Sequence, residues 1–185
     1  MTDTQKLPNP EFSRKVNLGD ISEKQPLVKS FTAKPEECEK LAKRFDLIEL
    51  KNLEADVTFT RKMAGRMAEV TGRFTVDVVQ RCIITLDPVP DHIEAEFEAF
   101  FTDIKPPTPI AGEVEMPPEE DAPEYVAGGA IDAGEVVAQY IALELDPYPR
   151  KDGAQHDITD ADMPPEEEKT HRPFAALAQL KKDNQ

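Results

Sequence analysis

The sequence predicts an α+β fold in which a mainly antiparallel sheet packs with two helices. Apolar and polar residues alternate over most of residues 53–103, as they do in half-buried strands, and two other segments carry apolar residues at helical spacing. The segments that connect the strand-like runs are too short for the crossover helices that parallel pairing requires. We expect one domain over residues 10–150, followed by a mostly disordered tail over residues 151–185.

The N-terminal part of this domain predicts two strands and a helix. Residues 11–21 and residues 28–33 have the composition of strands. Residues 35–45 place apolar side chains on one helical face. Pro35 stands at the first helical position, and acidic residues follow in the first turn, where the helix dipole favours negative charge. The segment is therefore expected to be the first helix.

The central part predicts the rest of the sheet. Residues 53–60, 70–78 and 93–99 alternate apolar with polar side chains. Prolines and aspartates in LDPVPD, residues 86–91, predict a turn between the last two runs. Together with the opening strands, these runs give a sheet of four or more strands.

The negative charge of the chain is concentrated in its C-terminal part. Residues 1–105 hold 16 Lys and Arg against 19 Asp and Glu, whereas residues 106–185 hold 6 against 18, within a net charge of −15. Residues 105–125 are acidic and proline-rich and offer little apolar surface to offset the entropy lost on ordering, which predicts a mobile acidic loop.

The second helix is expected directly after this loop. Asp132 and Glu135 have the spacing of a capping box, in which Asp132 accepts a backbone N–H and Glu135 reaches back. Pro147 and Pro149 end the helix. The apolar residues at helical spacing are Val136, Val137, Tyr140, Ile141 and Leu145.

The last part of the tail, RPFAALAQLKK, differs from the polar sequence before it. It predicts a short helix over residues 173–181 that is too short to be stable alone in water, so it must dock on its own domain or on a partner. Both alternatives remain open. The residues expected to dock are Pro173, Phe174, Leu177, Leu180 and Lys181.

No catalytic constellation is evident. The chain lacks a phosphate-binding glycine loop, the metal-binding pattern HExxH and the nucleophile pattern GxSxG, and its three histidines are scattered. Cys38 and Cys82 are expected to be free thiols. For Cys82 we weigh a metal ligand or reactive thiol against a small apolar residue of the sheet, and the second interpretation is favoured. We therefore expect no enzyme, metal or cofactor.

The sequence also lacks a membrane span and a signal peptide, which predicts a cytoplasmic protein. Basic residues of the expected strands offer a possible phosphate-binding surface if the sheet brings them onto one face, although an ordinary solvated face is the favoured alternative. These expected rRNA contacts are Arg61, Arg66, Arg73 and Arg81.

Three stretches of the sequence carry a resemblance to a known family. They are QRCIITLDPV with Cys82, IDAGEVVAQYIALELDPYPR with Asp132, Pro147 and Pro149, and the terminal PFAALAQLK. In their order and spacing they resemble the bacterial large ribosomal RNA subunit accumulation protein family, also called the YceD family. Many of its members have CxxC at the Arg-Cys element, whereas this chain has Val79 at the first position, so we expect no structural metal.

The resemblance implies a non-enzymatic role in making or stabilising large-subunit (23S) rRNA in a bacterial cytoplasm. The expected partner is the rRNA or a basic ribosomal protein, with no role at membranes or on DNA, and the oligomeric state is left open. A second hypothesis is an acidic protein-interaction module unrelated to ribosomes.

Overall fold

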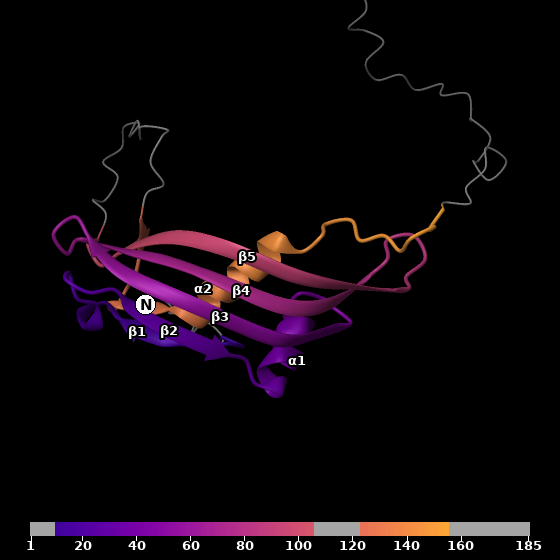
Figure 1. Ribbon diagram of the computed structural model, residues 1–185, viewed down its shortest axis with the longest axis horizontal. Coiled ribbons are helices and arrows are strands. Elements are labelled where there is room, and N and C mark those ends of the chain that lie inside the picture. Colours follow the sequence, from indigo (N-terminus) through magenta and orange to yellow (C-terminus); the bar gives the residue numbers. More distant parts are fainter. Residues whose placement is uncertain (1–9, 106–122, 156–185) are drawn as a thin grey trace, which may run out of the picture. The chain divides into compact units, whose positions relative to one another are not determined.

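The computed structural model describes residues 10–105 and 123–155 of the chain (Figure 1). The chain divides into two units, Met1–Asp152 and Gly153–Gln185, and all described elements belong to the first. In chain order these elements are β1 (Lys15–Asn17), the 3-10 helix η1 (Leu18–Asp20), β2 (Leu27–Thr32), α1 (Pro35–Arg44), β3 (Glu49–Lys62), β4 (Met67–Arg81), β5 (Pro88–Thr102), β6 (Glu124–Tyr125), β7 (Ala130–Asp132) and α2 (Ala133–Glu144). The predicted α+β class is confirmed.

The main sheet has five strands in the order β2-β3-β4-β5-β6, and its first four strands are antiparallel neighbours. Strands β3, β4 and β5 are long, with 14, 15 and 15 residues. Short turns join them in sequence, which explains why crossover helices are not needed. An irregularity between Lys51 and Glu54 shifts the register of β3 against β4, and Asn52 has a positive φ of 54° there.

One face of this sheet forms the core. Its fully buried side chains include Leu53, Val57, Phe59, Phe74 and Val76, which alternate with exposed or half-buried neighbours along β3 and β4. The apolar sides of α1 and α2 belong to the same core. Figure 1 shows α2 behind the strands β3–β5, so that its view faces the opposite, uncovered side of the sheet.

A small second sheet joins the start of the described chain to the start of α2. Strand β1 pairs with β7 in antiparallel fashion, from Lys15 opposite Asp132 to Asn17 opposite Ala130. Phe12 and Leu18 flank this strand and are buried at 1% and 2% exposure. The expected opening strand at residues 11–21 is therefore shorter than predicted, because η1 takes over directly after Asn17.

The expected turn at residues 86–91 is also partly wrong, because β5 already begins at Pro88. Pro88 pairs with Arg81 and Pro90 with Val79 inside the β4–β5 ladder. Over these residues the other side of β5 has no neighbouring strand in the described part of the chain. Proline, which lacks an N–H, is tolerated in such an edge strand.

The predicted acidic loop at residues 105–125 falls mostly outside the described residues. Its last part is structured, since Glu124 and Tyr125 form β6, which pairs in parallel with Phe101 and Thr102 of β5. The five-stranded sheet is therefore mixed rather than wholly antiparallel. The predicted terminal helix at residues 173–181 also lies outside the described residues.

Candidate functional site

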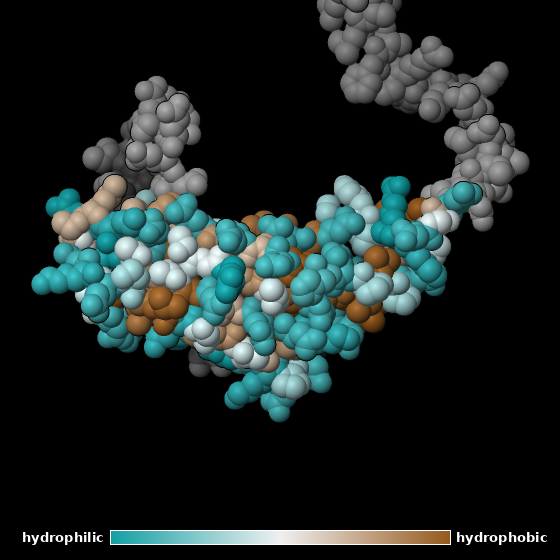
Figure 2. All heavy atoms as spheres, viewed as in Figure 1, coloured by the Kyte–Doolittle hydropathy of each residue, from teal (hydrophilic) through white to brown (hydrophobic). Residues whose placement is uncertain are grey.

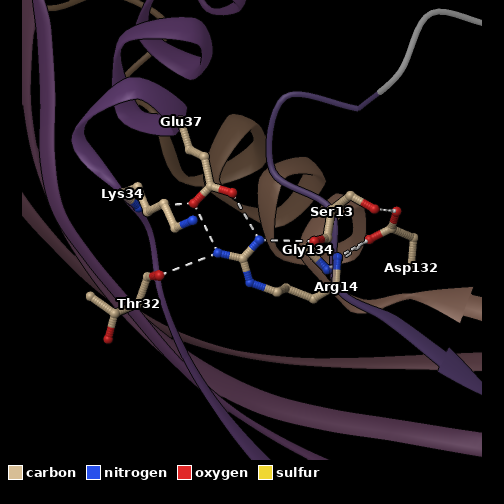
Figure 3. Close-up of polar contacts among 7 residues, drawn as sticks. All are labelled: Ser13, Arg14, Thr32, Lys34, Glu37, Asp132 and Gly134. Carbon is tan, nitrogen blue, oxygen red and sulfur yellow. Dashed lines mark hydrogen bonds and ion pairs between the residues drawn. The ribbon is translucent and has the colours of Figure 1, made fainter.

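Asp132 connects the start of α2 to the N-terminal segment (Figure 3). Its Oδ1 accepts hydrogen bonds from the backbone N–H groups of Gly134 at 3.2 Å and Glu135 at 3.3 Å, as an N-cap does. The same oxygen accepts the N–H of Arg14 at 2.7 Å, and Oδ2 accepts the hydroxyl of Ser13 at 2.5 Å. One carboxylate therefore caps a helix and fixes a segment almost 120 residues earlier in the chain.

The expected capping box is only half formed, because the side chain of Glu135 points elsewhere. Its two oxygens accept hydrogen bonds from the guanidinium of Arg44 at 2.8 and 2.7 Å. This guanidinium lowers the pKa of the Glu135 carboxyl. The pair joins the end of α1 to the first turn of α2, where a negative side chain is favourable.

A second polar junction, which the sequence did not reveal, lies beside Asp132 (Figure 3). Arg14 donates to both oxygens of Glu37 at 2.9 and 2.8 Å, and also to the carbonyl of Ser13 at 2.8 Å. This guanidinium lowers the pKa of the Glu37 carboxyl. Glu37 also accepts the backbone N–H of Lys34 at 2.8 Å, which ties the start of α1 to the same junction.

Cys82 follows β4 and is fully buried. Its Sγ accepts backbone N–H groups from Thr85 at 3.4 Å and Lys151 at 3.5 Å. These bonds, led by the one from Lys151, lower the pKa of the Cys82 thiol to about 6. Cys82 thus holds the β4–β5 turn against the segment that follows α2.

The prolines of the motif lie in that same segment but differ in exposure. Pro149 is buried and its carbonyl accepts the N–H of Ile83 at 2.9 Å, whereas Pro147 is exposed. The side chain of Gln80 donates to the carbonyl of Asp146 at 2.9 Å. The structure therefore brings Cys82 and Pro149 together. Asp132 stands at the other end of α2, a helix about 18 Å long.

The four arginines expected to contact rRNA are not gathered on one surface. Arg61 is half-buried and donates to the carbonyls of Gly65 at 2.8 Å and Leu18 at 2.6 Å. Arg66 is exposed in the β3–β4 turn, and Arg81 is exposed at the end of β4, eight residues or roughly 26 Å beyond Arg73. Arg73 pairs with Asp56 at 3.3 Å. A shared phosphate-binding patch is therefore not formed by these residues.

The uncovered side of the main sheet carries a different set of charges. We call it the open face: the side chains of β3, β4 and β5 that alternate with the buried ones. In the described chain its acidic members are Glu49, Glu54, Asp56, Glu69, Asp77, Glu94, Glu96 and Glu98. Figure 2, seen from the side that Figure 1 shows, is hydrophilic over much of this surface.

Three basic side chains of the open face have acidic partners, whereas Arg81 at the end of β4 makes no ion pair with other described residues. Lys51 pairs with Glu49 at 2.9 Å, Lys62 with Glu69 at 3.1 Å, and Arg73 with Asp56. Asp77 has another partner, since it accepts hydrogen bonds from His92 and Asn52, which lower the pKa of its carboxyl. Each of these residues is thus matched within the sheet.

Four carboxylates of the open face make no ion pair or hydrogen bond with other described residues: Glu54, Glu94, Glu96 and Glu98. The last three follow each other on β5 at a spacing of about 7 Å, and Glu54 lies two strands from Glu94, with Thr75 between them. At about 7 Å in water, two like charges repel by roughly 0.6 kcal/mol before salt screening. The open face therefore holds uncompensated negative charge.

The open face is also hollowed. A depression of about 630 Å³ lies over the central strands, and its polar lining includes Asp56, Thr58, Thr71, Glu96 and Glu98. A second one of about 360 Å³ adjoins it and is lined in part by Ser30, Thr32, Glu54, Thr75 and Glu94. Hydroxyl and carboxylate groups thus share the walls of both depressions with the guanidinium of Arg73.

Several expected features receive no structural description. The docking residues Pro173, Phe174, Leu177, Leu180 and Lys181 lie outside the described residues. Within residues 10–105 and 123–155, no three His, Cys, Asp or Glu side chains come together as a metal site. In that same part of the chain no helix has the length and apolarity needed to cross a membrane. Cys38 and Cys82 are both buried free thiols, as predicted.

Comparison with protein-family models matches residues 70–181 to the family described as large ribosomal RNA subunit accumulation protein YceD. The match covers more than half of the chain and contains Cys82, Asp132, Pro147 and Pro149. The chain belongs to the YceD family. Neither the curated proteins nor the solved structures contain a match.

The YceD match begins within β4, so it leaves β1, β2, α1 and β3 ahead of it. These earlier elements are nevertheless part of the same core, because β3 pairs along most of its length with β4 and α1 packs on β3. The row of glutamates on β5 lies inside the matched segment. A sequence signal for it exists, namely acidic residues at every second position from 94 to 98.

Proposed function

We propose that this protein is a ribosome-biogenesis factor that supports the synthesis, processing or accumulation of large-subunit (23S) rRNA in the bacterial cytoplasm. The observation that carries this proposal is the YceD match over residues 70–181. The family description names an outcome, the accumulation of an RNA, rather than a reaction. We therefore propose that the protein acts by binding and not by catalysis.

Two partners suit such a role, the rRNA itself and a basic ribosomal protein. The scattered positions of the four arginines give little support to a direct rRNA contact through the strands. A net charge of −15 and the unpaired glutamates of the open face favour a basic protein, because such a surface repels phosphates and attracts lysine and arginine. We therefore propose a basic ribosomal protein as the direct partner, with rRNA levels responding to its delivery.

The test is the ratio of large- to small-subunit rRNA in cells depleted of this protein. Depletion should lower the ratio, and expression of the full chain should restore it. A second culture that expresses residues 1–168 asks whether the terminal segment is required. A ratio that depletion leaves unchanged would contradict the proposal and favour an interaction module unrelated to ribosomes.

A further inference from the structure

The open face is the broadest surface of the main sheet that no other described element covers. The opposite face is buried by α1, α2 and the β1–β7 pair, whereas the open face leaves two depressions and four unpaired carboxylates accessible. Glu54, Glu94, Glu96 and Glu98 are each exposed. Any ligand of this surface must compensate negative charge on β3 and β5.

We propose that the open face binds an extended, lysine- and arginine-rich polypeptide segment of the partner protein. This inference rests on the proposed function and adds to it the surface and the form of the ligand. Cationic side chains on such a segment compensate the carboxylates that lack partners within the described sheet.

The spacing of the charges favours an extended ligand. Glu94, Glu96 and Glu98 stand on one strand at intervals of two residues, about 7 Å apart. Every second side chain of an extended peptide has the same interval, so successive cations of the ligand can meet successive glutamates. A helical ligand presents neighbouring side chains of one face at about 5–6 Å and does not keep this register.

The centre of the open face can also rearrange to accept a cation. Arg73 contacts Asp56 at 3.3 Å, and the two side chains are 67% and 48% exposed. Exposed pairs of this kind contribute little stability, so an incoming lysine can replace Arg73 beside Asp56 at small cost. Asp56 lines both depressions, which gives such a side chain room.

The acidic character of the surface disfavours nucleic acid as its ligand. Phosphate groups are bound by lysine and arginine that release condensed counterions. Lys51, Lys62 and Arg73 of the open face are already paired with acids, which leaves Arg81 at the far end of β4 as the unpaired base among its described residues. Single-stranded RNA also stacks on exposed aromatic rings. On β5, Phe100 is the aromatic residue on the same side as Glu94, Glu96 and Glu98. Its ring is only half-exposed, so it offers little surface for a base to stack on.

The experiment measures binding of a fluorescein-labelled decalysine peptide to the full-length chain at low salt. The test variant is the triple substitution Glu94→Gln, Glu96→Gln and Glu98→Gln, which keeps side-chain size and removes three charges. We expect it to weaken binding about tenfold. The matched control, Glu119→Gln, Glu120→Gln and Asp121→Asn, removes the same charge from another segment and should weaken binding less than twofold.

Equal weakening by both triple variants would overturn the proposal, because it would show attraction to net charge and not to the open face. A single-stranded 23S rRNA fragment that binds the wild-type chain and loses affinity in the Glu94, Glu96 and Glu98 variant would assign the face to RNA and also overturn it. Circular dichroism and urea unfolding of the variants confirm that they fold. This experiment measures binding alone. Its failure would therefore contradict the role of the open face, whereas failure of the rRNA ratio test would contradict the proposed function.

Discussion

The two faces of the main sheet are built from the same three strands but use their side chains differently. On the covered face, Phe59, Phe74 and Val76 are at most 1% exposed and pack under α1 and α2. On the open face, their immediate neighbours are threonines, an arginine and an aspartate, which contact solvent. The alternation of one strand thus separates the residues that stabilise the fold from those available to a partner.

The charges follow the same division. Near the covered face, ionic groups are matched at junctions, as in Arg14 with Glu37 and Arg44 with Glu135. On the open face, the glutamates of β5 remain unmatched among the described residues. Unmatched like charges oppose folding slightly, and we interpret their presence as a feature of binding rather than of stability.

The largest expected effect comes from the core side of β4. Phe74→Ala should lower the free energy of unfolding by about 3–5 kcal/mol, because it removes a buried ring and leaves a cavity. Its neighbour on the open face offers a matched control, since Thr75→Ala should change this free energy by less than about 0.5 kcal/mol. Urea unfolding measures both, and equal losses would contradict the division between the faces.

The next effect concerns the junction at Asp132. Asp132→Ala should lower the free energy of unfolding by about 2–3 kcal/mol, because the helix cap and the bonds to Ser13 and Arg14 are lost together. Asp132→Asn keeps an accepting oxygen for the cap and should lose about half as much. If the alanine and asparagine variants lose the same free energy of unfolding, the oxygen that asparagine keeps for the helix cap contributes nothing to stability.

We expect the contribution of Cys82 to the free energy of unfolding to increase with pH, and that of Cys38 not to do so. The folded-state pKa of Cys82 is about 6, below the ordinary value of about 8.5, so its contribution to stability is complete above that ordinary value and is lost as pH falls through 6. The difference in unfolding free energy between wild type and Cys82→Ala should therefore grow from pH 6 to pH 9.

Cys38 provides the control for this titration. Burial raises the pKa of its thiol, so its contribution is present at lower pH and declines as pH rises above the ordinary value. The difference in unfolding free energy between wild type and Cys38→Ala should consequently shrink over the upper part of the same pH range. If the two free-energy differences vary with pH in the same way, the N–H groups of Thr85 and Lys151 do not stabilise a thiolate at Cys82.

The smallest effect on stability is expected on β5. The substitutions Glu94→Gln, Glu96→Gln and Glu98→Gln together should change the free energy of unfolding by less than about 0.5 kcal/mol, with a slight gain at low salt because repulsion is removed. Thermal unfolding at low and high salt checks this. A large loss of stability would mean that these glutamates are part of the fold.

The sequence predicted the parts of this structure that depend on local pattern. Helix α1 and the cap at Asp132 follow from residues within a few positions of each other, and both are present. The partner of Glu135 did not follow, because Arg44 lies 91 residues away and becomes its neighbour only through packing. Pro88 and Pro90 suggested a turn because the sequence does not show that β5 has an unpaired side there.

The sequence also did not show on which face of the sheet each strand residue lies. The sequence left open whether the basic strand residues share one face, and the register of β3 on β4 sends Arg61 and Arg73 to opposite faces of the sheet. The alternation of Glu94, Glu96 and Glu98 was visible in the sequence as a strand pattern. Its meaning as a charged surface required the neighbouring strands, which supply few free cations.

The most direct test is the ratio of large- to small-subunit rRNA in depleted cells that express either the wild-type chain or the chain with Glu94→Gln, Glu96→Gln and Glu98→Gln at equal levels. We predict that the wild-type chain restores the ratio and that the folded triple variant does not. Full restoration by the triple variant would contradict the claim that the open face is the working surface of this protein.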